Sequence, residues 1–183
     1  MGGRSSRMGH DKALLPFRGT TLGHCVAREV ALAVGTAVLV GDPQTYEKLG
    51  FPVIPDLHPG EGPLGGILTA LKHTQARWNL IVACDMPGLS GEFLMKLLEA
   101  AKTADADAFV PQNPDSGLPE PLCAVYRREA RAGMEAAFRR GVRKVMAALE
   151  DGSAGLRLVR FPTSEVASFR NVNTPEEWAC VDL

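Results

Sequence analysis

The first twelve residues combine glycines with cations in a way that suits phosphate binding. The segment holds three glycines and three basic residues: Gly2, Gly3, Gly9, Arg4, Arg7 and Lys12. Glycines let backbone N–H groups approach phosphate oxygens without obstruction by a Cβ atom. Arg7 and Lys12 can neutralise phosphate charge, and Lys12 is suited to stabilise a leaving group. The spacing is neither GxxxxGK[ST] nor GxGxxG, and a solvated N-terminal tail explains the composition equally well.

Asp56 follows a short apolar segment and precedes a glycine-rich turn, in the sequence FPVIPDLHPGEGPLGGI. A carboxylate at this place could accept hydrogen bonds from the N1–H and N2–H₂ edge of guanine, which adenine does not offer. The alternative is an aspartate that caps a turn before a helix, which is the more frequent use of such a residue.

Asp85 ends a continuous apolar run in LIVACDMPGLS, where Pro87 turns the chain away. A carboxylate at the carboxyl end of a core strand is well placed to hold Mg²⁺ that bridges triphosphate oxygens. Mg²⁺ needs only one or two protein carboxylates when phosphates and waters complete its shell. A turn or N-cap aspartate is again the structural alternative. We expect the neighbouring Cys84 to be a packed thiol rather than a nucleophile.

The elements that must position these residues alternate between strand and helix patterns. We expect strands near residues 36–40, 52–54, 80–83, 108–111, 122–126 and 156–161, and helices over 22–34, 45–49, 64–73 and 90–102, two within 128–150, and one opened by a capping box at Thr174. This alternation predicts an α/β fold with a mostly parallel sheet and helices on both faces. Ligands of such sheets bind beyond the carboxyl ends of the strands, which is where the unusual residues lie.

Composition limits the classes of protein that fit. The chain has 183 residues and a net charge of -1, which argues against a general nucleic-acid binder. No apolar run reaches the roughly 18 residues that span a bilayer, so we expect no membrane partner. The four cysteines are far apart and are interpreted as reduced thiols of a cytoplasmic protein: Cys25, Cys84, Cys123 and Cys180.

Taken together, four motifs in order resemble one family of enzymes. GGRSSRMGHDK is similar to the signature LAGGxSxRMGxDK of nucleotidyltransferases with a Rossmann-like fold, and more narrowly to the molybdenum cofactor guanylyltransferases. PD…GPLGGI, CDMP and NVNTPEE follow as in that family. The resemblance covers Gly2 to Trp178 and implies a single three-layer α/β domain over 1–183, with a nucleotide-binding half at 1–100 and an acceptor-binding half at 101–183.

In the nucleotide-binding half, the resemblance implies a complete set of roles. Gly2 and Gly3 would contact the phosphates of GTP through their backbone. Arg7 and Lys12 would bind the triphosphate and steady the departing pyrophosphate. Asp56 would read guanine, and the catalytic set Arg7, Lys12 and Asp85 would work with Mg²⁺ held by Asp85.

In the acceptor half, the resemblance implies a site for molybdenum-molybdopterin. Arg143 and Lys144 follow a break at Gly141 and are expected near a helix start, where phosphate is favoured. Asn171 and Asn173 alternate on an extended segment, so both amides can meet phosphate or pterin groups. A solvated helix face and an asparagine-rich turn are the structural alternatives.

The implied reaction is Mg²⁺-dependent transfer of GMP from GTP to the phosphate of molybdenum-molybdopterin, with release of pyrophosphate. Transient contact with cofactor-delivering proteins or molybdoenzyme chaperones belongs to the same expectation. Two alternatives stay open at this point. One is a related enzyme that uses CTP or a sugar-phosphate acceptor, and the other is a non-catalytic nucleotide-binding module.

One departure concerns the sheet. In the family a buried strand precedes the glycines, whereas only Met1 precedes Gly2 here. We therefore expect the first, inner strand to be missing from this sequence and the true start to lie upstream. A sheet without an inner strand leaves backbone donors and apolar surface unpaired.

Overall fold

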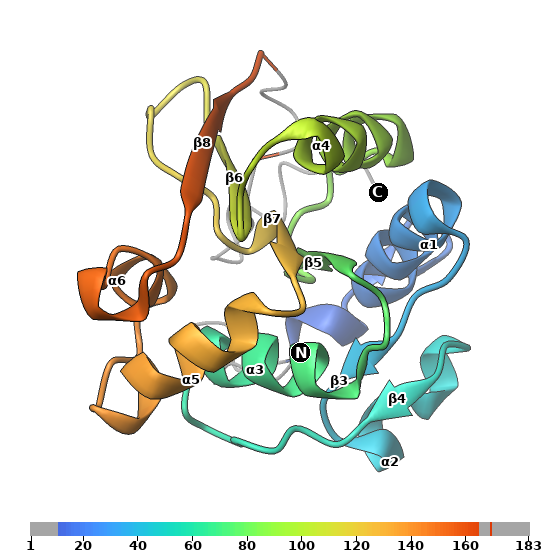
Figure 1. Cartoon of the computed structure of the whole chain (residues 1–183). Helices are drawn as coiled ribbons and strands as arrows, with labels where there is room; N and C mark the ends of the chain where they lie inside the picture. Colours follow the sequence, from blue (N-terminus) through green and yellow to red (C-terminus); the bar gives the residue numbers. More distant parts are fainter. Residues whose placement is uncertain (1–10, 165–168, 170–183) are drawn as a thin grey trace.

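The computed structural model describes residues 11–164 and residue 169, and its centre is a mixed four-stranded sheet (Figure 1). Its strands lie in the order β5 (Trp78–Val82), β7 (Cys123–Arg127), β6 (Ala108–Gln112) and β8 (Leu158–Pro162). β7 is antiparallel to both of its neighbours, while β6 and β8 are parallel. Three of the four strands therefore point the same way, as the predicted mostly parallel sheet requires, and β7 is reversed.

Helices cover both faces of this sheet, which gives three layers (Figure 1). Alternate residues of β7 show this: Ala124 and Tyr126 are buried in one core, whereas Val125 is buried in the other. The first core contains residues of α3, α5 and α6, and the second contains residues of α1 and α4. The helix bounds are Leu22–Val34 for α1, Pro63–His73 for α3, Gly91–Thr103 for α4, Ala130–Arg139 for α5 and Val145–Leu149 for α6. The predicted α/β layering is therefore confirmed.

Two further strands form a separate parallel pair, β3 (Leu39–Val40) and β4 (Val53–Ile54). Within the described residues, no hydrogen-bonded strand joins this pair to the larger sheet, and β5 pairs only with β7. Every residue of β5 is partly exposed, whereas the first four residues of β6 and of β7 are buried.

Short elements complete the described chain. They are η1 (Lys12–Leu14), the hairpin β1 (Pro16–Phe17) and β2 (Thr20–Thr21), α2 (Pro43–Tyr46), η2 (Glu47–Leu49) and η3 (Gly152–Ala154). The predicted cap at Ser90 is confirmed, because its hydroxyl accepts a hydrogen bond from the N–H of Phe93. The predicted break near Gly141 is also confirmed, since α5 ends at Arg139 and Gly141 has a φ of 91°. No helix among the described residues has the length and apolarity needed to cross a bilayer.

Candidate functional site

The structure brings together two of the predicted catalytic residues. Nζ of Lys12 lies 3.2 Å from Oδ2 of Asp85, although the two residues are 73 positions apart. Lys12 begins η1, and Asp85 lies just beyond the carboxyl end of β5. Their side chains are 14% and 25% exposed, so the pair is sheltered but reachable from solvent. A cation and a carboxylate at a strand end are the groups that a nucleoside triphosphate and a divalent cation need.

Asp11 fixes the backbone that carries Lys12. Its Oδ1 accepts a hydrogen bond of 3.0 Å from the N–H of Ala13, and this interaction caps η1. Its Oδ2 accepts a hydrogen bond of 2.5 Å from the hydroxyl of Tyr46 in α2. Burial, followed by this hydrogen bond, raises the pKa of Tyr46 far above its ordinary value, so the phenol stays protonated and can only donate to Asp11. Ala13 of η1 is fully buried. The Asp11 cap and the packing of Ala13 therefore both hold η1 in place.

A second carboxylate, Glu120, approaches Asp85 from the segment before β7. The β5–β7 register ends with Val82 opposite Cys123, and the N–H of Ala83 then donates to the carbonyl of Leu122 at 2.7 Å. Both segments then turn, and the N–H of Cys123 donates to the carbonyl of Glu120 at 3.1 Å. Burial raises the pKa of Glu120, a hydrogen bond from the Asn113 side chain opposes this shift, and the charge of Asp85 adds to it. The sequence analysis did not identify Glu120, because its place depends on the reversal of β7.

Asp56 lies in a capped turn, as its structural alternative predicted. Its Oδ1 accepts a hydrogen bond from the N–H of His58 at 2.9 Å and lies 3.0 Å from Oγ1 of Thr69 in α3. Thr69 is fully buried and also accepts a hydrogen bond from the N–H of Leu57. Oδ2 of Asp56 has no hydrogen-bond partner among the described residues. The turn therefore uses one carboxylate oxygen, and no described residue donates a hydrogen bond to the other.

The same turn rests on Gly65 of the GPLGG segment. A Cβ atom built on Gly65 would lie 2.8 Å from Cβ of His58 and 3.1 Å from its carbonyl oxygen. The adjacent Gly66 has no atom within 4 Å of the equivalent position. Only the first of the two glycines is thus required by close packing, and it seats the turn that holds Asp56 on α3.

Arg143 and Lys144 lie just before α6, as predicted, but the Arg143 guanidinium is already engaged. Its Nε donates to Oε2 of Glu61 at 2.5 Å, and its Nη1 donates to the carbonyl of Phe138 at 2.8 Å. Lys144 is the exposed N-cap residue of α6, a helix of five residues. Arg143 therefore joins the segment before α6 to the loop that follows Asp56, and a phosphate would have to compete with Glu61 for it.

Five predicted site residues lie outside the described residues: Gly2, Gly3, Arg7, Asn171 and Asn173. The helix expected after Thr174 lies there as well. Their roles stay predictions.

The groups around Asp85 suit a cation that takes part of its ligands from the substrate. Burial, with the charge of Asp85 next in size, raises the pKa of Cys84 to about 11, so this thiol is protonated at neutral pH. Across the described residues, no group of three or more His, Cys, Asp or Glu side chains could hold a metal ion by itself. Phosphate and water oxygens would have to complete the shell of a cation bound at Asp85.

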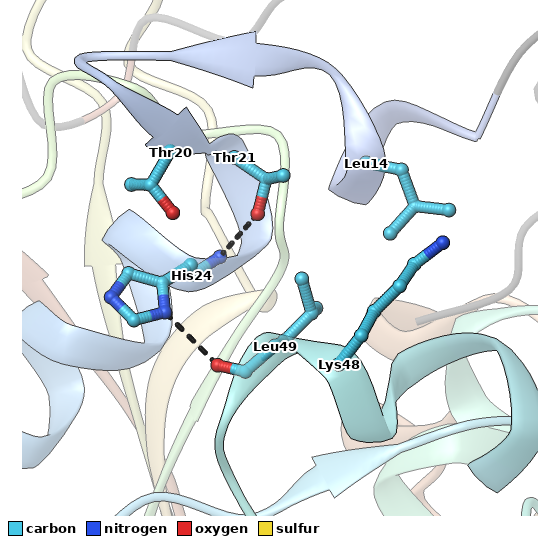
Figure 2. A pocket seen from close by; sticks show the side chains of 6 residues that line it. All are labelled: Leu14, Thr20, Thr21, His24, Lys48 and Leu49. Atoms are coloured by element: carbon cyan, nitrogen blue, oxygen red, sulfur yellow. Dashed lines mark hydrogen bonds between the residues drawn. The ribbon is translucent and has the colours of Figure 1, made fainter.

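A hollow of about 230 Å³ lies beside this site, and Figure 2 shows its walls. It is lined by Leu14, Thr20, Thr21, His24, Lys48 and Leu49, and by none of Lys12, Asp56 and Asp85. Nδ1 of His24 donates to the carbonyl of Leu49 at 2.9 Å across it (Figure 2). The hollow thus lies between the start of α1 and η2, and the Lys12–Asp85 pair does not line it.

Similar proteins agree on the class of domain. The MobA-like NTP transferase domain matches residues 1–153. A molybdenum cofactor guanylyltransferase of Cupriavidus metallidurans is 33% identical over 96% of this chain and 88% of its own length. A probable molybdenum cofactor guanylyltransferase of Methanothermobacter thermautotrophicus is 35% identical over 96% of this chain and 93% of its own length.

Solved structures support the same fold. The molybdopterin-guanine dinucleotide biosynthesis protein A of Archaeoglobus fulgidus superposes with a TM-score of 0.76 at 30% identity, over 98% of this chain and 91% of that chain. A cytidylyltransferase of Thermus thermophilus superposes with a TM-score of 0.69 at 16% identity, over 92% of this chain and 90% of that chain, which shows the fold alone. The match of the family model over residues 1–153 shows that the chain, with its Lys12–Asp85 pair just beyond the end of β5, belongs to the family of MobA-like NTP transferase domains.

Proposed function

We propose that this protein transfers GMP from GTP to the phosphate of molybdenum-molybdopterin and releases pyrophosphate. The observation that carries the proposal is the 3.2 Å contact between Lys12 and Asp85, because it joins the glycine-rich segment to the strand end where a triphosphate would lie. Support also comes from the guanylyltransferases named above, which this chain resembles over nearly its whole length.

The chain's own residues would act mainly through position and charge. The acceptor phosphate is already ionised at neutral pH, so its attack on the α-phosphorus needs no protein base. Lys12 would neutralise the triphosphate and the departing pyrophosphate, exchanging its bond to Asp85 for a bond to phosphate oxygen. Arg7 would share this task.

A divalent cation, which we take to be Mg²⁺, fits the donor set at this place. Asp85 would hold it, and Glu120, whose pKa is raised in part by the charge of Asp85, offers a second carboxylate. The cation would supply positive charge to the phosphate oxygens when bound. Carboxylate oxygens are the ligands that Mg²⁺ prefers, and two of them are sufficient when substrate phosphates and waters take the other positions.

The base would be read by Asp56. Oδ1 is fixed by Thr69 and by the N–H of His58, which orients Oδ2 for the N1–H and N2–H₂ edge of guanine. Inosine triphosphate lacks the N2 amine and adenosine triphosphate lacks both donors. We therefore expect turnover to fall in the order GTP, ITP, ATP, and the Asp56→Asn variant to lose most of this discrimination.

The acceptor would bind at the second half of the domain. Arg143 and Lys144 are proposed to contact its phosphate, and Asn171 and Asn173 its phosphate or pterin groups. Gly2 and Gly3 are proposed to contact the phosphates of GTP. The Arg143–Glu61 contact would open when phosphate binds. We further propose a cytoplasmic reaction with transient contacts to proteins that deliver or receive the cofactor.

The test is pyrophosphate release in the presence of Mg²⁺, molybdenum-molybdopterin and each of GTP, CTP, ATP and UTP. Lys12→Ala and Asp85→Ala should each lower turnover about 100-fold, the usual cost of removing a principal electrostatic stabiliser. Lys48→Ala is the matched control, because it removes a lysine from the adjacent hollow and should leave turnover unchanged.

Release with CTP instead of GTP would assign the protein to the cytidine-using relatives and would remove Asp56 from its proposed role. GTP binding without pyrophosphate release would support the non-catalytic alternative. Full turnover in the Lys12→Ala and Asp85→Ala variants would contradict the assignment of this site.

A further inference from the structure

The segment formed by α2 and η2 lies against η1 and α1 and contacts both. The Tyr46 hydroxyl donates to Oδ2 of Asp11 at 2.5 Å. Three residues later, the Leu49 carbonyl accepts from His24 in α1 (Figure 2). The Tyr46 ring is 4% exposed and packs in one small core with Ala13 of η1. The segment is therefore fixed at two points and can serve as a rigid support.

The hydrogen bond from Tyr46 reaches Asp11, which is the residue before Lys12. Asp11 uses Oδ1 to cap η1 through the N–H of Ala13 and uses Oδ2 to accept the Tyr46 hydroxyl. With both oxygens occupied, the Asp11 side chain has one orientation, and the start of η1 is fixed with it. The Lys12 ammonium then meets Asp85 at 3.2 Å. Without the phenol, Asp11 could rotate about its side-chain bonds and the first turn of η1 would lose part of its cap.

We propose that Tyr46 is a positioning residue for Lys12, acting through Asp11 on the placement of the ammonium group against the phosphates. This inference rests on the proposed function, because it assumes that Lys12 acts on the triphosphate. Tyr46 donates to Asp11 and, among the described residues, has no hydrogen bond to Lys12 or Asp85. A displacement of a charged group by a fraction of an ångström is enough to weaken a transition-state contact.

The experiment compares Tyr46→Phe with Thr45→Val in the full-length protein. Each variant removes one hydroxyl that donates to an aspartate, and the two positions are adjacent in α2. The Thr45 hydroxyl donates to Asp42, which caps α2 and has no bond to η1 among the described residues. The kcat of pyrophosphate release, the KM for GTP and the thermal midpoint are measured for each variant, alone and combined with Lys12→Ala.

We expect Tyr46→Phe to lower kcat roughly tenfold, the effect of losing one hydrogen bond to a charged group, while Thr45→Val keeps the wild-type kcat. In the Lys12→Ala background, Tyr46→Phe should lower kcat no further, because the group that it positions is gone. A change in general stability would instead lower kcat in both backgrounds.

The same tenfold loss in the Lys12→Ala background would overturn the proposal, and so would an unchanged kcat in Tyr46→Phe. Absence of both turnover and GTP binding in the wild-type protein would have a different meaning. It would remove the proposed function, and the inference would fall with it.

Discussion

Replacing Gly65 by alanine tests how the turn that holds Asp56 is built. The added Cβ would lie 2.8 Å from Cβ of His58 and 3.1 Å from its carbonyl oxygen. Carbon atoms in contact are separated by about 3.5–4.0 Å, so His58 would have to move by about 1 Å. One of the two close atoms belongs to the backbone, and a side-chain rotation cannot relieve the whole overlap.

The size of the effect follows from two opposing terms. Overpacking of this kind costs about 1–3 kcal/mol. The exchange of glycine for alanine inside a helix returns about 0.5–1 kcal/mol. Gly66→Ala is the matched control, since its Cβ meets no atom within 4 Å and only the favourable term applies. We therefore expect Gly65→Ala to be less stable than Gly66→Ala by about 1–3 kcal/mol.

The assay is urea unfolding of both variants, combined with the ratio of kcat/KM for GTP over ITP. Movement of His58 would displace the Asp56 carboxylate, because the two share the turn that Thr69 holds. Gly65→Ala should thus lose part of its preference for GTP, and Gly66→Ala should keep it. Equal unfolding free energies for the two variants would refute the steric argument, and a full GTP preference in Gly65→Ala would refute the link to Asp56.

Two other predictions concern charged groups. Glu120→Gln should weaken Mn²⁺ binding by roughly tenfold, because it removes a carboxylate that interacts with the charge of Asp85. The affinity is measured by electron paramagnetic resonance. Unchanged Mn²⁺ affinity would exclude Glu120 from the cation site. Asp107→Asn should lower the free energy of unfolding at pH 7 by about 1 kcal/mol, since Asp107 accepts three hydrogen bonds from Arg157. These contacts hold the pKa of Asp107 below its usual 3.8, so their stabilising effect is present above that pH and is lost as the pH falls through the depressed value. The gap between Asp107→Asn and wild type should close on acidification, and a gap that stays constant in urea unfolding at low pH would contradict this assignment.

The layers of the fold could be predicted from the sequence because each element carries its own local pattern. Ser90 caps α4 as its side chain and position indicate, and Gly141 breaks the helical stretch after α5. The direction of β7 has no such local signal, because an apolar run such as CAVYR is buried on both faces whichever way it points.

Residues of the candidate site could be predicted from the sequence when they lie at the end of a single helix or strand. Asp85 and Lys12 are of this kind, and the structure places their side chains 3.2 Å apart, while their catalytic roles stay predictions. Glu120 was missed because its charge interacts with that of Asp85 only after two segments that are far apart in sequence have folded together. Tyr46 was missed for a similar reason, since a hydroxyl in α2 reaches Asp11 only after the chain has folded.

The strand order of the larger sheet has a consequence for synthesis on the ribosome. Val82 of β5 pairs with Cys123, which leaves the ribosome about 40 residues later, and Ala108 of β6 pairs with Leu158 after a similar delay. β5 must therefore wait several seconds for β7, its partner among the described strands, at ordinary rates of translation. During that interval the apolar residues of β5 can pair with other nascent chains, and the carboxyl end that carries Asp85 has not yet met Glu120. The sheet edge that precedes Asp85 can thus form only after β7 has left the ribosome.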